Sequence, residues 1–258
     1  MNIHSTLYLF FDLDGTVLVK GKLPEENLTA MKRAQAMGHK LILNTGRSRG
    51  GYATVPQANA VPWDGMCFSA SDINYQGKNI HLVTVCEEDF NIWLEYCMEH
   101  RVRLAYCGRE WLEYLDFTTY KNPMTEAQKD EHRVYAAALF RKNPLTNVSV
   151  HTVIPPETIP RSGLIPIQLS TYADLFPHGC NKGKVIENFC AALDVPIAQC
   201  ICFGDSANDV DMFRVCPTSV AMPYAPDELS SLATYVASGK YGVAEGLCHL
   251  LNFSLDEE

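Results

Sequence analysis

Short apolar runs without alternation recur along the chain, and several of them end abruptly at polar residues. Residues 6–11 form such a run, which stops at Asp12. An unbroken apolar run of this length predicts a parallel strand that is covered on both faces by helices. The same pattern predicts further strands at residues 41–43, 65–69, 199–203 and 219–222.

Helical periodicity fills the intervals between these runs. In residues 25–37, Leu28, Met31 and Ala34 recur at helical spacing, and Gly38 follows as a stop signal. Similar patterns predict helices at residues 184–193, 208–215 and 243–251. The alternation of strands and helices predicts an α/β fold with a doubly wound, Rossmann-like parallel sheet and right-handed crossovers. Such sheets carry their chemistry just beyond the carboxyl ends of the strands.

The middle of the chain has a different rhythm. Alternating, aromatic-rich runs at residues 102–106 and 111–115 predict an antiparallel hairpin, and helices are expected at residues 88–100 and 125–140. After residue 177 the first pattern resumes. We therefore predict an α+β cap domain at residues 81–177, inserted into a catalytic core made of residues 1–80 and 178–258.

Composition narrows the class of protein. The chain has 258 residues, 47% of them hydrophobic and 20% charged, which predicts a folded core and excludes disorder as its main character. A formal charge of -9 does not favour binding to nucleic acid or to anionic membranes. The ten cysteines are scattered without a C-x-x-C pair, which is typical of a reducing, cytoplasmic location. We expect neither a signal peptide nor a membrane span.

Acidic residues follow two of the predicted strands. Asp12 and Asp14 end the first strand, and Asp205 and Asp209 come after the strand at residues 199–203. Carboxylates at buried strand ends are costly unless a cation or hydrogen bonds compensate them. An all-oxygen ligand set without His or Cys favours Mg²⁺ over zinc. The alternative is that these acids only cap helices or start turns.

Four motifs, taken together in this order, resemble the haloacid dehalogenase superfamily of phosphatases. The similarity is to the Cof-like branch, which has a large α/β cap. The first and fourth motifs are rare by chance, whereas the second and third are individually weak. The motifs are Asp12-Leu13-Asp14-Gly15-Thr16, Thr45-Gly46-Arg47, Lys182-Gly183 and Gly204-Asp205-Ser206-Ala207-Asn208-Asp209.

The resemblance implies a role for each acid of the first motif. Asp12 is expected to be the nucleophile that forms an aspartyl-phosphate, which water then hydrolyses. Asp14 is expected to protonate the leaving group and then to activate water. Mg²⁺ is expected to be held by the Asp12 carboxylate, the Asp14 carbonyl and Asp205, with Asp209 counted in the metal set.

Other residues are implied to hold the substrate. Thr45, the Gly46 amide and Lys182 are expected to bind the transferring oxygens. Asn208, counted among the substrate-binding residues, and Asp209 are expected to support the metal and the lysine from behind. Lys182 could instead be a solvated charge, and Thr45 could merely cap the next segment.

Two further candidates are less tied to the motifs. Arg47 is a candidate substrate-binding residue, with a structural or surface role as the alternative. Asp174 is a candidate substrate-binding residue that could contact a sugar hydroxyl, as could His178, with hinge or surface roles as the alternative for both. We interpret the aromatic residues Tyr106, Trp111 and Tyr114 as the core of the cap rather than as a platform on which a sugar stacks.

Two stretches depart from the pattern of the branch. Residues 69–71 read Ser-Ala-Ser where relatives usually have Asn-Gly-Ala, and residues 221–225 read Ala-Met-Pro-Tyr-Ala where they usually have Ala-Met-Gly-Asn-Ala. Both stretches are expected near the mouth of the site. A substrate therefore cannot be taken over from relatives.

The sequence thus predicts a Mg²⁺-dependent phosphatase that acts on small phosphomonoesters, with sugar phosphates as the expected class. A phosphosugar mutase that uses the same aspartyl-phosphate is one alternative, and a catalytically weak sugar-phosphate sensor is another. The expected partner is a small phosphorylated metabolite, without nucleic acid or membrane, and the chain is expected to be a monomer or a weak homodimer.

Overall fold

The computed structural model describes residues 5–255, which group into two compact units. Among these residues, the core unit comprises 5–46, 55–82 and 181–255, and the second unit comprises 47–54 and 83–180. The short segment 47–54 thus joins the second unit. The reason is that its short helix packs closely against the backbone of the second unit, so that a Cβ atom on Gly50 would overlap the backbone of Trp111.

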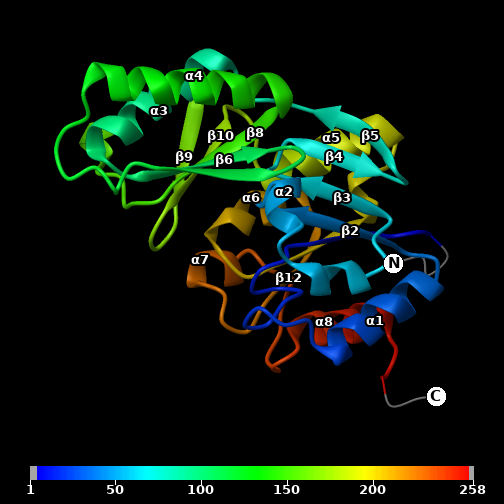
Figure 1. The fold of residues 1–258 in the computed structure, drawn as a ribbon. Coiled ribbons are helices and arrows are strands. Elements are labelled where there is room, and N and C mark those ends of the chain that lie inside the picture. Colours follow the sequence, from blue (N-terminus) through cyan, green and yellow to red (C-terminus); the bar gives the residue numbers. More distant parts are fainter. Residues whose placement is uncertain (1–4, 256–258) are drawn as a thin grey trace. The chain divides into compact units, whose positions relative to one another are not determined.

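The core unit contains an eight-stranded sheet in the order β13-β12-β11-β1-β2-β3-β4-β5 (Figure 1). Neighbouring strands from β13 to β3 run parallel, and β4 and β5 continue the sheet as an antiparallel hairpin. The predicted parallel sheet is therefore confirmed. The strands are β1 (Tyr8–Phe11), β2 (Lys40–Thr45), β3 (Gly65–Phe68), β4 (Asp72–Tyr75), β5 (Lys78–Leu82), β11 (Cys200–Gly204), β12 (Thr218–Ala221) and β13 (Tyr235–Val236).

Helices cover this sheet on both faces. They are α1 (Glu25–Ala36), α5 (Lys182–Leu193), α6 (Val210–Val215), α7 (Asp227–Ser230) and α8 (Gly242–Leu251). Helices α1 and α8 lie side by side (Figure 1). All but the four-residue α7 correspond to predicted helices.

Strand β1 shows why its sequence is apolar without alternation. Successive side chains of a strand point to opposite faces, and both Phe10 and Phe11 are fully buried. The Phe10 ring packs edge-on against Phe189 of α5, with ring centroids 5.2 Å apart. The Phe11 ring stacks on Phe203 at 4.6 Å. The space beside Phe203 is filled by α8, because a Cβ atom on Gly246 would contact that ring.

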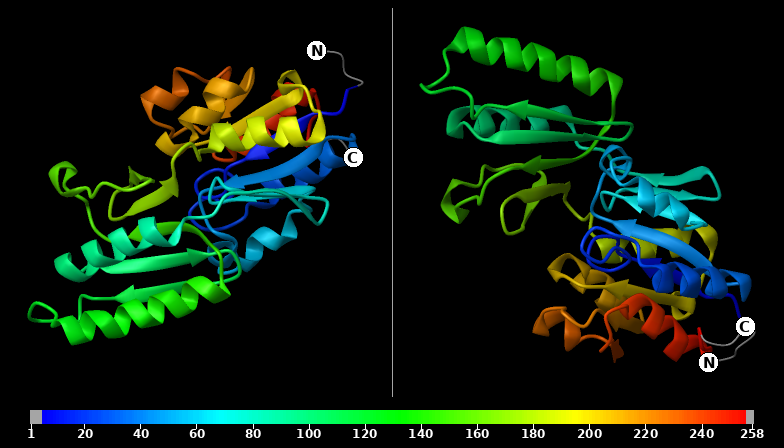
Figure 2. Two further views of the ribbon diagram at one scale, coloured as in Figure 1. Left: turned by 90° about the horizontal axis from the view of Figure 1, so that it is seen from above. Right: turned by 60° about the horizontal axis from the view of Figure 1, so that its bottom comes forward.

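The second unit contains a separate five-stranded sheet in the order β7-β6-β8-β10-β9, in which every pairing is antiparallel. Helices α3 and α4 lie on one face of it, because buried residues of both helices share one apolar core with residues of β6 and β8; Figure 2 shows this unit in two views. The elements are α2 (Arg49–Tyr52), α3 (Glu87–His100), β6 (Arg103–Gly108), β7 (Leu112–Asp116), α4 (Glu126–Lys142), β8 (Leu145–Val150), β9 (Leu164–Gln168) and β10 (Ala173–Pro177).

This unit confirms the predicted α+β character of the insert, including the β6–β7 hairpin and both helices. Strands β8 to β10 are not assigned by the sequence pattern. Short 3₁₀ turns at residues 56–60, 156–158, 197–199 and 207–209 complete the structure. Within residues 5–255, every helix is too short or too polar to cross a membrane.

Candidate active site

The nucleophile candidate lies where β1 ends beside β11. The Asp12 amide donates a hydrogen bond of 3.0 Å to the Phe203 carbonyl, which continues the pairing of the two parallel strands by one residue. The Asp12 residue is only 5% exposed. Its carboxylate is therefore presented at the carboxyl edge of the sheet, as predicted, and is largely shielded from water.

The chain turns tightly after Asp12. The Gly15 amide donates to the Leu18 carbonyl at 2.9 Å, and Gly15 has a φ of +92°, in the left-handed region that favours glycine. A Cβ atom at this position would overlap the Asp205 carboxylate. Glycine is thus required here both by the backbone conformation and by the close approach of Asp205.

Lys182, the first residue of α5, contacts residues of both the first and the fourth motif. Its Nζ atom donates to Asp12 Oδ1 at 2.6 Å, to Asp209 Oδ1 at 2.5 Å and to Asn208 Oδ1 at 3.2 Å. The lysine is only 3% exposed. Its backbone is held by Asn44 of β2, whose side-chain amide donates to the Lys182 carbonyl at 3.0 Å. The alternative that Lys182 is a solvated surface charge is therefore wrong.

Asp209 connects the lysine to the loop that carries Asp205. While Asp209 Oδ1 faces Lys182, its Oδ2 accepts the amides of Asp205 at 2.9 Å and Ser206 at 3.1 Å. Asp205 in turn accepts a hydrogen bond of 3.1 Å from the Thr16 hydroxyl. Asp209 therefore positions both the Lys182 ammonium group and the loop at residues 205–206. Asp205 thus lies beside the first motif.

Crowded charge dominates the electrostatics of the cluster. Carboxylate oxygens of Asp12, Asp205 and Asp209 lie within 4.8 Å of one another. Burial raises the pKa of Asp12 well above its usual range, and Asp209 and Asp205 add to the increase against the lowering effect of Lys182. Burial and Asp209 likewise raise the pKa of Asp205 to about 6. The negative charges of Asp12 and Asp209 keep the Lys182 pKa above its ordinary value despite burial.

These residues can hold a metal ion. When all are ionised, the three carboxylates and the Lys182 ammonium carry two surplus negative charges, which one divalent cation balances. The donors are all oxygen atoms, the ligand type that hard cations prefer. Because like charges close together are unfavourable, a bound cation would relieve the repulsion that raises the Asp12 and Asp205 pKa values.

The remaining predicted core residues lie on adjoining segments. Asp14 is exposed on the turn after β1, where it forms an isolated bridge with Leu18. Thr45 is buried as the last residue of β2, next to β1 in the sheet, and Gly46 follows it. The structure thus gathers Asp12, Lys182, Asp205, Asn208 and Asp209 by direct contacts.

Arg47 and Asp174 both belong to the second unit, where they interact with each other. Asp174 lies in β10 opposite Ser149 of β8, and the Ser149 hydroxyl donates a hydrogen bond to its carboxylate. Burial raises the Asp174 pKa to about 6, although Ser149 and the positive charge of Arg47 act against the increase. These contacts make Asp174 part of a polar cluster. For His178, the structure gives a main-chain hydrogen bond of 2.9 Å to the Gly163 carbonyl.

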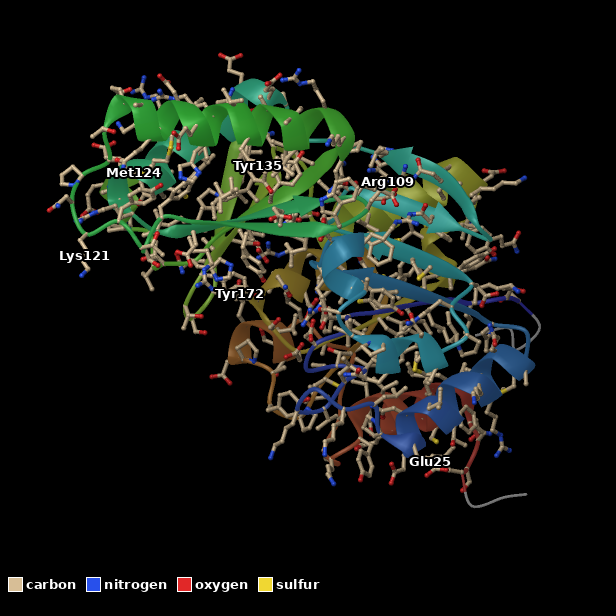
Figure 3. The ribbon with its side chains drawn as sticks, viewed as in Figure 1. Glu25, Arg109, Lys121, Met124, Tyr135 and Tyr172 are labelled. Carbon is tan, nitrogen blue, oxygen red and sulfur yellow. The ribbon has the colours of Figure 1, made fainter. Side chains whose placement is uncertain are left out.

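The aromatic residues of the second unit divide into two groups. Tyr106 is fully buried and donates to the Asn143 carbonyl at 2.6 Å, as expected of a core residue. The same interpretation is wrong for Trp111 and Tyr114, which are 38% and 51% exposed. Side chains alternate along a strand, so β7 turns Tyr114 away from the helix-covered face on which Leu115 is buried. The Tyr114 ring packs edge-on against His151, whose ring stacks on Tyr172, labelled in Figure 3.

Sequence reasoning missed four residues that support the site. Asn44 holds the Lys182 backbone, Thr16 bonds Asp205, and the Ser206 hydroxyl donates to Asn208 Oδ1 at 2.9 Å. The hydroxyl of Tyr224 donates to the Gly15 carbonyl. Thr16 and Ser206 lie within the motifs, which could have drawn attention to them, and Tyr224 lies in one of the two departures.

Comparison with known proteins identifies the family. The haloacid dehalogenase-like hydrolase family matches residues 9–247, which is most of the chain. The chain therefore belongs to this family, and the resemblance inferred from the four motifs is confirmed.

Proteins with similar sequences include an endoribonuclease and a phosphatase. The chain is 26% identical over 267 residues to the chloroplastic endoribonuclease YBEY of Arabidopsis thaliana, a match that covers 93% of this chain and 46% of that protein. It is 35% identical over 83 residues to the HMP-PP phosphatase of Yersinia enterocolitica, covering 31% and 30%. The chain thus spans less than half the length of each of these relatives.

Among solved structures, a subclass IIB sugar phosphatase of the same superfamily has a similar fold. Its TM-score is 0.75 at 19% sequence identity, and the match covers 95% of this chain and 99% of the other. At this level of identity the similarity concerns the fold.

Proposed function

We propose that this protein hydrolyses small phosphomonoesters, with sugar phosphates as the substrate class, through an aspartyl-phosphate on Asp12 and with Mg²⁺ as cofactor. The observation that carries the proposal is the contact of Lys182 Nζ with both Asp12 and Asp209 beside Asp205. Three segments far apart in sequence supply this arrangement. It supports the proposal because a candidate nucleophile, a cation and carboxylates that could bind a metal ion lie together.

In the proposed mechanism, an Asp12 carboxylate oxygen attacks phosphorus and the bond to the leaving oxygen breaks. Lys182 holds Asp12 Oδ1 in place and lends positive charge to the oxygens of the phosphoryl group. Asp14 donates a proton to the leaving oxygen and later accepts one from water, which attacks phosphorus, breaks its bond to the Asp12 oxygen and releases inorganic phosphate. Its exposed position on the turn gives it access to solvent.

Asp12 and Asp205, with the Asp14 carbonyl, would hold the Mg²⁺. When bound, the ion would offset the repulsion between an anionic nucleophile and an anionic phosphate. Thr45 and the Gly46 amide, at the end of β2, are proposed to bind the remaining phosphoryl oxygens. Asp209 and Asn208 keep Lys182 oriented throughout.

The second unit is proposed to act as the cap that selects the leaving group. In support, the face of its sheet opposite α3 and α4 carries polar and aromatic side chains such as Asp174, Ser149 and Tyr114. Hydroxyl-rich sugars match such a surface, because carboxylates accept hydrogen bonds and aromatic rings pack on C–H faces.

A cytoplasmic location is proposed because the cysteines are scattered along the sequence.

A phosphate-release screen tests the proposal. Sugar phosphates, nucleotides and cofactor phosphates are each offered with Mg²⁺, and with EDTA as the matched control. Metal-dependent release that is fastest for sugar phosphates supports the proposal. Isomer formation without net release would favour a mutase instead. Binding of sugar phosphates without any turnover would favour the sensor.

A further inference from the structure

Tyr224 is an unusual residue on the loop that follows β12. It stands in the Ala-Met-Pro-Tyr-Ala stretch, where relatives of the branch usually have Asn at the same place. Its side chain is 53% exposed, so the ring contributes little to the core. Its hydroxyl nevertheless donates a hydrogen bond to the Gly15 carbonyl, across 209 residues of sequence.

Gly15 is the most constrained point of the turn after β1. On one side it packs directly against the Asp205 carboxylate, and the next residue, Thr16, donates to that same carboxylate at 3.1 Å. On the other side the Gly15 carbonyl accepts the Tyr224 hydroxyl. The turn therefore contacts two loops of the core unit, one that carries Asp205 and one that carries Tyr224. Asp14 immediately precedes Gly15 in this turn.

We propose that Tyr224 is a positioning residue that fixes the turn at residues 13–18, so that the Asp14 carbonyl and Asp205 are held ready to bind a metal ion together. This inference rests on the proposed function. Without the hydroxyl, the Gly15 carbonyl loses its contact with the loop after β12, and the metal must then order this part of the turn as it binds.

The substitution Tyr224→Phe removes the hydroxyl and keeps the ring. One neutral hydrogen bond corresponds to a factor of about 3 to 10 in an equilibrium constant, so we expect the Kd for Mg²⁺, measured by titration calorimetry on the protein alone, to rise by that factor. Amide hydrogen exchange of the metal-free protein should speed up within residues 13–18. The Tm should fall by no more than about 2 to 4 °C, because only one hydrogen bond is lost and the residue is half exposed.

Tyr235→Phe is the matched control. The Tyr235 hydroxyl also makes one side-chain hydrogen bond, to Glu245 Oε1 at 2.7 Å, but it joins β13 to α8 instead of contacting the turn. This variant should leave the Mg²⁺ Kd and the exchange of residues 13–18 unchanged.

The two proposals fail in different ways. An unchanged Mg²⁺ Kd and unchanged exchange in Tyr224→Phe would overturn the positioning role, even if the wild type is an active phosphatase. An absence of turnover in the wild type would overturn the proposed function. The binding and exchange measurements would still decide the role of Tyr224, because neither requires catalysis.

Discussion

Lys182 Nζ lies 2.6 Å from Asp12 Oδ1, although 170 residues separate them in sequence. Both side chains are nearly excluded from water. A buried ion pair of this kind is weak evidence for stability, since removing two charges from water is costly. The proposed function gives the pair a reason instead: the lysine would hold the nucleophile and offset part of the negative charge that would repel a phosphate.

Replacing Lys182 by methionine should therefore affect both stability and turnover. Three crowded carboxylates lose their bonded cation, which should lower the free energy of unfolding by about 3 to 5 kcal/mol. The value of kcat/KM should fall by about a hundredfold or more. Urea unfolding and phosphate release measure the two effects.

Lys184→Met is the matched control on the same helix, because Lys184 is 53% exposed and pairs only with the neighbouring Glu187 at the surface. It should change the free energy of unfolding by less than about 1 kcal/mol. A Lys182→Met protein as stable and active as this control would contradict the account of the cluster.

Gly15→Ala should abolish activity, because the added methyl group must displace the Asp205 carboxylate. The substitution also strains the backbone, because Gly15 has a positive φ. Gly21→Ala separates the two effects: Gly21 also has a positive φ, of +73°, but a Cβ atom there meets open space. It should cost about 1 kcal/mol through backbone strain and leave turnover intact. Equal loss of activity in both variants would show that strain alone is responsible.

Asp174 should make the protein less stable as the pH rises from about 4 to about 6. The pKa of Asp174 is near 6 in the folded state and about 3.9 in the unfolded state. Between about pH 4 and 6 Asp174 therefore stays protonated in the folded protein but not in the unfolded chain, and above about pH 6 it is ionised in both. Asp174→Asn should therefore raise the free energy of unfolding at pH 7.5 by about 1 to 2 kcal/mol, and the gain should vanish near pH 4.

Asp116→Asn is the control, because Asp116 lies in the same unit and its pKa is shifted in the opposite direction. Hydrogen bonds from Thr118 and Arg103 lower the Asp116 pKa, so this substitution should destabilise the protein slightly at pH 7.5. Urea titrations at several pH values measure both variants. An Asp174→Asn difference that does not change with pH would show that this carboxylate titrates normally.

Much of the core could be predicted from the sequence because parallel strands meet at one edge. The runs before Asp12 and Asp205 are apolar and unbroken, and β1 pairs directly with β11, so the two motifs had to converge. The second unit was harder. Residues 145–150 mix Thr, Asn and Ser with apolar residues, and Pro166 interrupts β9, so no clear alternation marks these strands.

Support for the site depends on contacts between distant residues. Asn44 reaches the Lys182 carbonyl across 138 positions, and nothing in the pattern around Asn44 signals it. Tyr224 could be noticed only as a departure from relatives. The partial exposure of Trp111 and Tyr114 was missed because an aromatic run looks the same whether its outer face is covered or open.

The central claim is that Asp12 takes up the phosphoryl group. The direct measurement is mass spectrometry of protein quenched in acid during turnover with Mg²⁺ and a rapidly cleaved aryl phosphate, with Asp12→Asn as the matched variant. We predict one added phosphoryl group on the wild-type peptide that contains Asp12, and neither this adduct nor phosphate release in the variant, which should remain folded. Phosphate release by a folded Asp12→Asn protein at the wild-type rate would contradict the account.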